Sequence, residues 1–287
     1  MVDPSTVPQE HAVEVFSEVL RRILTEPQQQ QLCLFLDVDG TLSEVAPTPA
    51  QAIITPEMRA VVEELSRLIP VSIVSGRGTE DVQRLVDLPD QEIFYAGSHG
   101  FDIRGPNVAL HVGEPHLASL HALHAILEEK MSSFGEAVLV EDKRLSLSVH
   151  YRNIAREEDV AQIIRTVEAE TQKFEELVVT HGKCVVEIRI NVDWNKGRAV
   201  TYLLNHYQDQ RQTPTVGLYL GDDRTDEDAF WELVDSCRGT GIVVMEKPRP
   251  SHAPFFVNSV TEVCQFLQQL LAHLQEQEYK SSQHLPL

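Results

Sequence analysis

The sequence is poor in positive charge and has no long apolar run. Its 287 residues contain 24 Lys and Arg against 44 Asp and Glu, a formal net charge of −20. This charge argues against nucleic acid and anionic membranes as partners. No apolar run approaches the ~18 residues of a membrane span, and the first residues, MVDPSTVPQEH, show neither the basic nor the apolar region of a secretory signal. An anionic ligand would have to be held locally, by a metal ion, backbone N–H groups and a few placed cations.

Cysteine is scarce as well. The four cysteines are far apart in the sequence and none belongs to a CxxC pair: Cys33, Cys184, Cys237 and Cys264. Because each lies in an apolar stretch, we expect reduced core residues of a cytoplasmic protein rather than disulfides or metal ligands. A hydrophobic content of 42% is ordinary for a globular protein, and the length allows one large or two modest domains.

What the sequence does contain is a buried strand that ends in acidic residues. Residues 32–42 read LCLFLDVDGTL, five apolar residues followed by turn residues, which predicts a strand buried on both faces of a parallel sheet. Asp37 and Asp39 then fall at the carboxyl edge, where open α/β sheets bind ligands. Gly40 allows backbone N–H groups to approach an anion. Carboxylates this close repel one another unless a cation lies between them or they take different protonation roles.

Two other interpretations of this stretch are a solvated turn and a calcium loop. The spacing excludes an EF-hand, which needs glycine at its sixth loop position, whereas Gly40 is fourth after counting from Asp37. A solvated turn is typical of an isolated DxDG string, so the functional interpretation depends on matching segments elsewhere. Three further apolar runs do end in polar residues: VSIVSGR (71–77), IFYAGSHG (93–100) and VGLYLGDD (216–223).

These segments supply different chemical groups. Ser75 offers a hydroxyl just before a helix that opens near Thr79, a typical anion site, although a structural turn explains this segment equally well. His99 by itself is more typical of a structural histidine, and Asp226 of a helix cap. Lys196 begins a predicted helix, where the helix dipole disfavours a cation. Its position is easier to explain if a phosphate or a carboxylate lies in front of it.

Taken together, the segments predict phosphoryl transfer at one edge of the sheet. Asp37 and Asp222, with Asp226 or Asp223 as a further carboxylate, make an oxygen-only site that suits Mg²⁺. Asp37 can attack phosphorus and form an aspartyl-phosphate. Asp39 can protonate the leaving alcohol and later deprotonate the water. A hydroxyl and an ammonium, from Ser75 and Lys196, would stabilise the transferring phosphoryl group.

The segment 113–190 has a different pattern. We predict the order αββαββ, with helices near 117–131 and 160–174 and strands at 138–143, 145–152, 177–180 and 183–190. The strands alternate with a period of two, which indicates an antiparallel sheet with both helices on its apolar face. The other face carries His150, Arg152, Lys183, Glu187 and Arg189. A solvated face would explain these residues, but a polar face of this kind is also suited to lie over an active site and hold hydroxyls.

We therefore predict an α/β core domain from residues 31–112 and 191–277, interrupted by the 113–190 insertion. An N-terminal helical extension over 1–30 would contain an amphipathic helix at 11–24. A helix over 259–277 would close the core, followed by a flexible tail at 278–287. The polar connections at both ends of the insertion suggest that it opens and closes over the core.

The polar segments together resemble the motifs of the haloacid dehalogenase-like phosphatases, in which DVDGTL would be the first motif, Ser75 the second, Lys196 the third and GDDRTDED the fourth. Within this group YAGSHGFDIRGP, LSVHYRN, GKCVVEIR, WNKGRA and GDDRTDEDAF are similar, in this order, to stretches of the trehalose-6-phosphate phosphatases. The similarity covers roughly residues 32–270. It implies a Rossmann-like core with a parallel sheet, an inserted α/β cap of the C2B type, and Mg²⁺-dependent hydrolysis of trehalose 6-phosphate.

The resemblance also implies roles for individual residues. It makes Asp37 the nucleophile and Asp39 the acid/base, and it assigns both, with Asp222, to Mg²⁺, Asp39 through its backbone carbonyl. It assigns Lys183 and Glu187 to sugar hydroxyls. The remaining expected substrate-binding residues are Gly40, Thr41, Arg77, His99, His150 and Arg152. Val38 and Ile190 depart from the usual family pattern of Tyr and Pro, but neither change removes a functional side chain.

Several alternatives stay open at this point. The core motifs would equally suit a phosphatase for another glycosyl phosphate, such as sucrose 6-phosphate or a glucosylglycerol phosphate, or a phosphotransferase or mutase. A non-catalytic sugar-phosphate sensor is a different class of protein, but it would need no acid/base such as Asp39 two residues after the nucleophile. We expect a small-molecule sugar phosphate as the partner and a monomer or weak oligomer.

Overall fold

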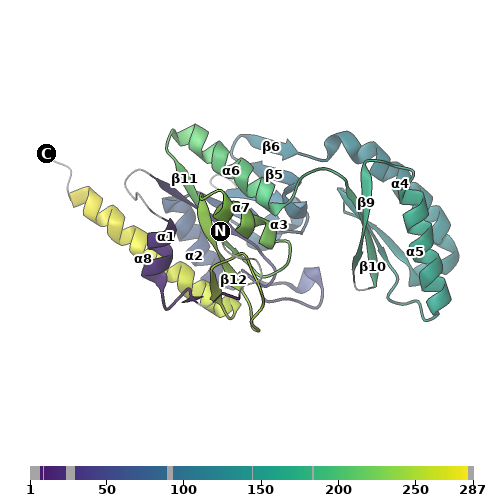
Figure 1. Cartoon of the computed structure of the whole chain (residues 1–287), viewed down its shortest axis with the longest axis horizontal. Coiled ribbons are helices and arrows are strands. Elements are labelled where there is room, and N and C mark those ends of the chain that lie inside the picture. The colour runs from purple at the N-terminus through teal and green to yellow at the C-terminus, as the bar shows by residue number, and fades with distance from the viewer. Residues whose placement is uncertain are drawn as a thin grey trace. The chain divides into compact units, whose positions relative to one another are not determined.

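The computed structural model describes residues 7–8, 10–23, 30–88, 93–143, 145–182 and 184–283. They form two compact units, which Figure 1 shows in one view. The core unit combines Met1–Leu110 with Trp194–Leu287, and the inserted unit consists of His111–Asp193. The core thus comes from both ends of the chain, and the middle segment is an insertion into it.

The core unit is built on one sheet, in which the described residues form nine strands in the order β1-β13-β12-β11-β2-β3-β4-β5-β6. Its centre is parallel: β12 (Gly239–Val244), β11 (Thr215–Gly221), β2 (Gln31–Leu36), β3 (Val71–Val74) and β4 (Ile93–Gly97). The five strands confirm the predicted Rossmann-like core. Residues 32–36 of β2 are all buried, as expected for a central strand that is covered on both faces.

Short strands extend the sheet at both edges, and the sequence did not predict them. At one edge lie β13 (Phe255–Val257) and β1 (Glu10–His11), and at the other β5 (Asp102–Gly105) and β6 (Val108–His111). These strands have two to four residues each, too few for a periodic pattern to identify them.

The N-terminal prediction was wrong in part. The helix expected over 11–24 is α1 (Phe16–Ile23), and it is preceded by β1, which pairs in parallel with β13. His11 Nε2 lies 2.8 Å from Glu262 Oε2, and this contact ties the added strand to the last helix of the core. Glu10 and His11, just before α1, are therefore part of the core sheet.

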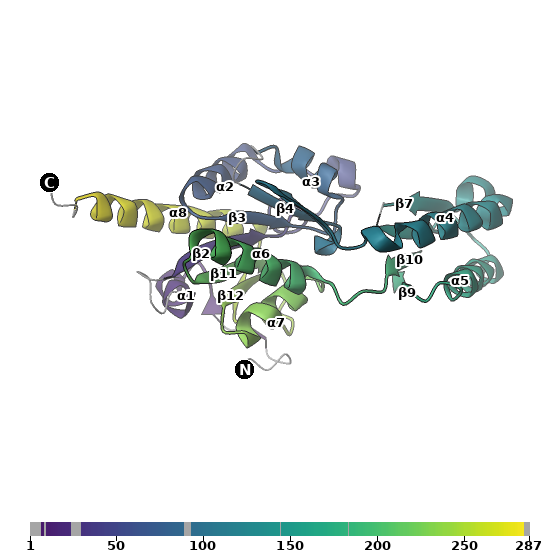
Figure 2. The ribbon, with the colours of Figure 1, turned by 90° about the horizontal axis from the view of Figure 1, so that it is seen from above.

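Helices cover both faces of the core sheet. Residues of α1, α2 (Pro56–Leu68), α3 (Thr79–Val86) and α8 (Val260–Gln283) pack in one apolar cluster with Leu34 and Leu36. Residues of α6 (Lys196–Arg211) and α7 (Glu227–Asp235) pack in a second cluster with Cys33 and Phe35. Because side chains alternate along β2, the two clusters lie on opposite faces of the sheet; Figure 2 shows α2 and α7 on opposite sides of it.

Capping residues begin one core helix, and another core helix ends later than expected. Helix α2 begins with Thr55 Oγ1 accepting a hydrogen bond from Met58 N and with Pro56 in the first turn. Helix α8 continues to Gln283, beyond the predicted end at 277, so residues 278–283 are helical. No helix within the described ranges is both long and apolar enough to cross a membrane.

The inserted unit has the predicted order αββαββ. It contains α4 (Leu117–Met131), β7 (Leu139–Asp142), β8 (Ser146–His150), α5 (Glu157–Thr171), β9 (Leu177–Gly182) and β10 (Val185–Ile190). The strands form an antiparallel sheet in the order β7-β8-β10-β9, and α4 and α5 lie together on one side of it (Figure 1). Apolar side chains of alternating residues in β8 and β10 are buried: Leu147, Val149, Val186 and Ile188.

The four cysteines differ in burial. All four are free, but only Cys33 is buried; Cys184 and Cys264 are half-buried and Cys237 is exposed. The prediction of four core thiols was therefore right for Cys33 alone. Cys184 and Cys237 both have positive φ, which places them in turns rather than in the regular elements that apolar neighbours suggested.

Candidate active site

The polar sequence segments meet at one edge of the core sheet. Strands β11, β2, β3 and β4 are neighbours and parallel, so their carboxyl ends lie side by side. The first residue after each strand is polar: Asp222, Asp37, Ser75 and Ser98. Four separate solvated turns would not produce this common placement, so these residues form a single candidate site.

A buried lysine connects three of these segments. Lys196 Nζ donates to Asp37 Oδ1 at 2.8 Å and to Asp226 Oδ1 at 2.7 Å. The three residues are 2%, 4% and 0% exposed. Burial would lower the pKa of Lys196, but the charges of Asp37 and Asp226 raise it well above its ordinary value. The cation at the start of α6 therefore faces carboxylates, one of the two explanations that its position suggested.

Asp226 is occupied by protein donors. Its Oδ1 accepts from Tyr219 OH at 2.6 Å as well as from Lys196, and its Oδ2 accepts from the backbone N–H groups of Asp222 and Asp223, each at 3.0 Å. A carboxylate has about four acceptor positions, so these four donors fill them. Asp226 makes no capping bond to the helix that follows it. Instead, it holds Lys196 and the loop after β11 in place.

The acidic residues fit a divalent cation. Asp37, Asp222 and Asp226 each bring a carboxylate oxygen within 4.8 Å of the others, and an oxygen-only donor set is typical of Mg²⁺. Burial first, and then the charges of Asp226 and Asp223, raise the pKa of Asp222 to about 7. A cation beside Asp222 would offset this repulsion. Because the acceptor positions of Asp226 are filled, Asp37 and Asp222 are the carboxylates with capacity left to bind it.

Glycine at position 40 allows two of the segments to touch. Gly40 has φ +79°, and a Cβ atom there would lie 2.2 Å from Asp222 Oδ2. Only glycine tolerates both the left-handed backbone and this contact. Next to it, Thr41 Oγ1 is buried and has no hydrogen-bond partner among the described residues. Its hydroxyl is therefore available to a bound ligand.

The second motif is connected to the first by an arginine. Arg77 Nε donates to Asp39 Oδ2 at 2.6 Å and Arg77 Nη2 to Asp39 Oδ1 at 2.7 Å. Arg77 Nη1 donates to Asp81 Oδ2 and to the carbonyl oxygen of Pro49, each at 2.9 Å. Ser75 Oγ accepts from Arg77 N at 3.2 Å, which leaves the hydroxyl hydrogen of Ser75 for another acceptor. Arg77, which the sequence predicts to contact the substrate, is thus directed at protein groups.

The loop after β4 has an unusual backbone. Residues 98–100 have φ of 50°, 58° and 88°, and consecutive left-handed residues are costly for side chains other than glycine. The first two N–H groups of this loop donate to Arg77 O at 2.6 Å and Ser75 O at 2.8 Å. From the other side, Trp194 Nε1 donates to Gly100 O at 2.7 Å. Strain that is held by contacts on both sides is typical of functional sites.

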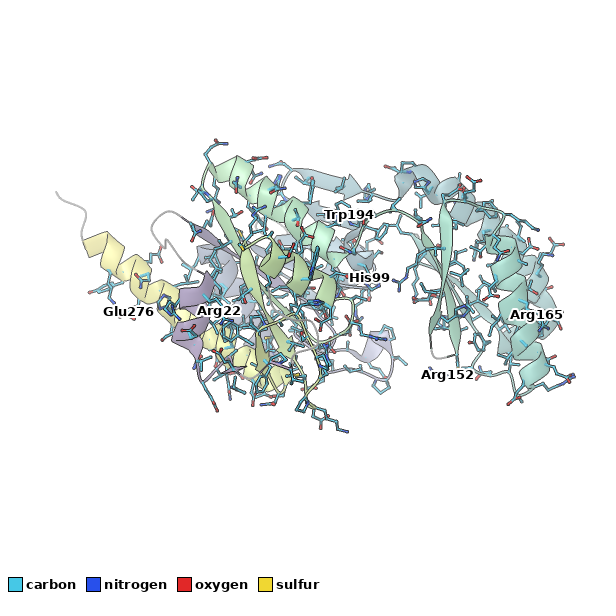
Figure 3. All side chains as sticks on the ribbon, viewed as in Figure 1. Arg22, His99, Arg152, Arg165, Trp194 and Glu276 are labelled. Atoms are coloured by element: carbon cyan, nitrogen blue, oxygen red, sulfur yellow. The ribbon has the colours of Figure 1, made fainter. Side chains whose placement is uncertain are left out.

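These contacts fix the position of His99 in the core unit. A Cβ atom at residue 76 would lie 2.8 Å from His99 Cε1, so glycine there allows the imidazole to lie against the loop of Ser75. Figure 3 labels His99 and Trp194 on the core unit. His99 thus belongs to the candidate site, next to the serine predicted to contact phosphate.

The inserted unit places two of the predicted binding residues on one polar face. His150 Nε2 lies 2.9 Å from Glu141 Oε2, and Arg189 Nη2 donates to Glu187 Oε2 at 2.5 Å. Ser148 is the register partner of both Glu141 and Glu187, so these three side chains share a face. The face therefore carries an organised polar network rather than isolated charges.

Three further residues belong to the inserted unit, and only two of them can be described. Ser148 Oγ is buried and has no hydrogen-bond partner among the described residues. Arg152 is exposed after the end of β8 and is labelled in Figure 3. Lys183, predicted to bind sugar hydroxyls, lies outside the described residues.

Comparison with known proteins identifies the family. A family model described as trehalose-phosphatase matches residues 35–261. The chain belongs to the trehalose-phosphatase family. It is therefore a phosphatase, as the sequence predicted.

Curated relatives of this trehalose-phosphatase family member agree with that assignment. The chain is 35% identical over 273 residues to trehalose-phosphate phosphatase B of Arabidopsis thaliana, with 91% of this chain and 70% of that protein covered. It is 38% identical over 249 residues to the trehalose-phosphate phosphatase of Mycobacterium marinum, with 84% of this chain and 62% of that protein covered.

Solved structures show the same fold. The C-terminal domain of C. albicans trehalose-6-phosphate phosphatase is similar, with a TM-score of 0.71 at 20% identity, covering 94% of this chain and 99% of that chain. A trehalose-6-phosphate phosphatase of Aspergillus fumigatus has a TM-score of 0.65 at 24% identity, with 90% and 97% covered. These similarities confirm the predicted haloacid dehalogenase-like fold.

Sequence reasoning missed three residues that support the site of this family member. Tyr219 donates to Asp226, Asp81 accepts from Arg77, and Arg249 Nη2 donates to Asp222 O at 2.8 Å. A tyrosine in an otherwise aliphatic strand was a signal for the first, because a buried phenol needs a partner. The spacing of four residues between Arg77 and Asp81 on a helix start was a signal for the second. For Arg249, which is distant in sequence, no signal was present.

The buried cluster leads to a stability prediction for this trehalose-phosphatase. Lys196→Ala should leave Asp37 and Asp226 buried without their cation and lower the free energy of unfolding by about 3–5 kcal/mol. Adding Asp226→Asn should recover part of the loss, because it removes one of the two charges. Urea denaturation at neutral pH without metal measures both effects.

A matched control for this measurement lies on α8. Lys280 Nζ is 2.8 Å from Glu276 Oε1 in an exposed pair, and Lys280→Ala should change stability by less than about 1 kcal/mol. Equal small losses for Lys196→Ala and Lys280→Ala would contradict the buried ionic cluster.

Proposed function

We propose that this protein hydrolyses trehalose 6-phosphate to trehalose and phosphate with Mg²⁺, through an aspartyl-phosphate formed on Asp37. The observation that carries the proposal is the cluster of Asp37, Lys196 and Asp226 beside Asp222, at the sheet edge where α/β proteins bind their ligands. The names of curated relatives supply trehalose phosphate as the substrate, and the name of a Zea mays relative specifies trehalose 6-phosphate.

The first step transfers the phosphoryl group to the protein. Because Lys196 holds Asp37 Oδ1, Oδ2 is the oxygen that attacks phosphorus. The bond between phosphorus and the sugar oxygen breaks, and its electron pair stays on the sugar oxygen, which takes a proton from Asp39. Lys196 and the hydroxyl of Ser75 stabilise the negative charge of the transferring group.

The second step releases phosphate. Water attacks phosphorus, Asp39 accepts a proton from it, and the bond to Asp37 breaks to restore the carboxylate. Asp39 is suited to this exchange because its side chain is 39% exposed, against 6% for that of Asp37. Thr41 Oγ1, the buried hydroxyl of the same turn, can donate to a phosphoryl oxygen in both steps.

Mg²⁺ would be held by the carboxylates of Asp37 and Asp222 and by the backbone carbonyl of Asp39. When bound, the ion supplies positive charge that offsets the negative charge of the phosphoryl oxygens and orients the phosphoryl group. Tyr219 and Asp226 keep Asp222 and Lys196 in place for this role. Asp226 itself acts as a positioning residue, because its acceptor positions are filled.

The sugar would be recognised by the polar face of the inserted unit. Paired side chains such as Glu187 with Arg189 and His150 with Glu141 offer donors and acceptors in fixed positions, which is what recognition of several hydroxyls needs. Arg152 and Lys183 are further candidates on this unit. In the core unit, Gly40 and His99 contribute to the substrate site through the loops that carry them.

The chemistry can be tested by measuring phosphate release from trehalose 6-phosphate with Mg²⁺. Asp37→Asn should abolish turnover, because an amide cannot attack phosphorus, and removal of the metal with EDTA should do the same. Asp39→Asn should slow the reaction by ~10²–10⁴. Asp87→Asn, a change at an exposed carboxylate with left-handed backbone that Asn also accepts, serves as the control. Near-normal turnover of Asp37→Asn, or of the native chain in EDTA, would contradict the mechanism.

Sugar recognition can be tested separately from the chemistry. Glu187→Ala should lower kcat/KM for trehalose 6-phosphate by a factor that corresponds to about 2–4 kcal/mol of transition-state stabilisation. The reason is that removing one partner leaves buried polar groups unpaired. Hydrolysis of an aryl phosphate, which lacks these hydroxyls, should hardly change. Glu168→Ala is a matched control, since Glu168 lies on α5 of the same unit and pairs with His181. Equal losses on both substrates would make Glu187 structural, and no loss on either would make it a solvated side chain.

A further inference from the structure

We propose that Arg77 is a positioning residue for the acid/base: its guanidinium fixes the side chain of Asp39 so that the proton reaches the leaving sugar oxygen. This inference rests on the proposed function, in which Asp39 is the acid/base. It differs from the role expected from the sequence, in which Arg77 contacts the substrate itself.

The geometry of the pair carries the inference. The two parallel bonds, Nε to Oδ2 at 2.6 Å and Nη2 to Oδ1 at 2.7 Å, fix the plane of the carboxylate as well as its distance, which a single hydrogen bond does not do. Each oxygen of Asp39 accepts one N–H group and keeps a second acceptor position. The fork thus orients Asp39 and leaves one position free on each oxygen, where Asp39 carries the proton for the leaving group in the first step and accepts a proton from water in the second.

Asp39 needs such a support more than Asp37 does. The carboxylate of Asp37 is buried and held by Lys196, whereas the side chain of Asp39 is 39% exposed. An exposed side chain without a partner samples several rotamers, and ordering it costs conformational entropy. The backbone of Asp39 is already fixed by a bridge to Ser43, so Arg77 fixes the one part of the residue that the fold leaves adjustable.

Arg77 is itself held rigidly. Its side chain is 9% exposed, and its Nη1 donates to Asp81 on α3 and to the carbonyl oxygen of Pro49 in the loop that follows the first motif. All but one of its N–H groups therefore have protein acceptors. A guanidinium engaged in this way would have to break existing bonds to contact a phosphoryl group, which favours the positioning role.

The two roles of Arg77 differ in how their loss depends on the leaving group. A sugar alcohol is a poor leaving group and needs the proton of Asp39, whereas nitrophenolate leaves readily as an anion. A displaced Asp39 therefore lowers kcat/KM for a sugar phosphate but not for p-nitrophenyl phosphate. Loss of a phosphate contact lowers kcat/KM for both, because both substrates carry the same phosphoryl group.

The test compares both substrates on the whole 287-residue chain with Mg²⁺. Arg77→Gln should lower kcat/KM for trehalose 6-phosphate by ~10–100-fold, since small misplacement of a catalytic group costs on this order. It should change kcat/KM for p-nitrophenyl phosphate by less than about threefold. Arg77→Lys, which keeps the charge but not the fork, should show the same selectivity with a smaller loss. Melting temperatures verify that the variants fold.

A matched arginine serves as the control. Arg104 in β5 makes a similar fork on Asp102, with Nε at 3.2 Å and Nη2 at 3.0 Å. Arg104→Gln should leave kcat/KM for both substrates within about threefold of the native values. In the Asp39→Asn background, Arg77→Gln should cause no further loss on trehalose 6-phosphate, because both changes disable the same group.

Each outcome distinguishes the inference from the function on which it rests. Equal losses on both substrates, no loss on either, or a further loss in the double variant would overturn the role of Arg77. If Asp39→Asn is selective for the sugar phosphate and Arg77→Gln is not, only the inference about Arg77 fails. If Asp39→Asn lowers kcat/KM equally for both substrates, the acid/base role of Asp39 fails, and the inference about Arg77 fails with it.

Discussion

Two buried carboxylates held by one ammonium group determine how the catalytic edge is built. Lys196 comes from the start of α6, Asp37 from the end of β2 and Asp226 from the turn before α7. Any one of these charges would be costly to bury alone, so the three segments are stable in these positions only together. Asp226 extends the arrangement to the loop of Asp222 through two backbone N–H groups. The site is thus assembled by the same ionic contacts that prepare the nucleophile.

The charge balance of this edge also explains why it suits phosphate chemistry in an acidic protein. Lys196 faces two carboxylates directly, and Asp222 adds a third, whose pKa is raised to about 7 by burial and by the neighbouring charges of Asp226 and Asp223. Excess negative charge of this kind favours binding of a divalent cation. The cation and Lys196 together would then attract the phosphoryl group, which the net charge of −20 would otherwise repel.

Much of this arrangement could be predicted from the sequence, because the informative segments are long or chemically distinctive. The buried strand before Asp37 and the parallel core follow from continuous apolar runs that end in polar residues, and the αββαββ insertion follows from the periodicity of its strands and helices. Short edge strands such as β1 and β5 have no detectable period. The direction of a long side chain was also beyond sequence reasoning: Arg77 was expected at the substrate, but pairs with Asp39 and Asp81. The partner of a long side chain depends on which acceptors the folded chain places within its reach.

The central claim is that Asp37 forms a covalent bond to phosphorus, and direct trapping of the intermediate tests it best. In Asp39→Asn, hydrolysis of the intermediate should be slow enough for it to accumulate during turnover of p-nitrophenyl phosphate, whose leaving group needs no proton. Acid quenching followed by peptide mass spectrometry should then show one added phosphoryl group, located on Asp37 and absent from Asp37→Asn. Turnover of p-nitrophenyl phosphate by Asp39→Asn with no phosphoryl group on Asp37 at any time point would contradict the account.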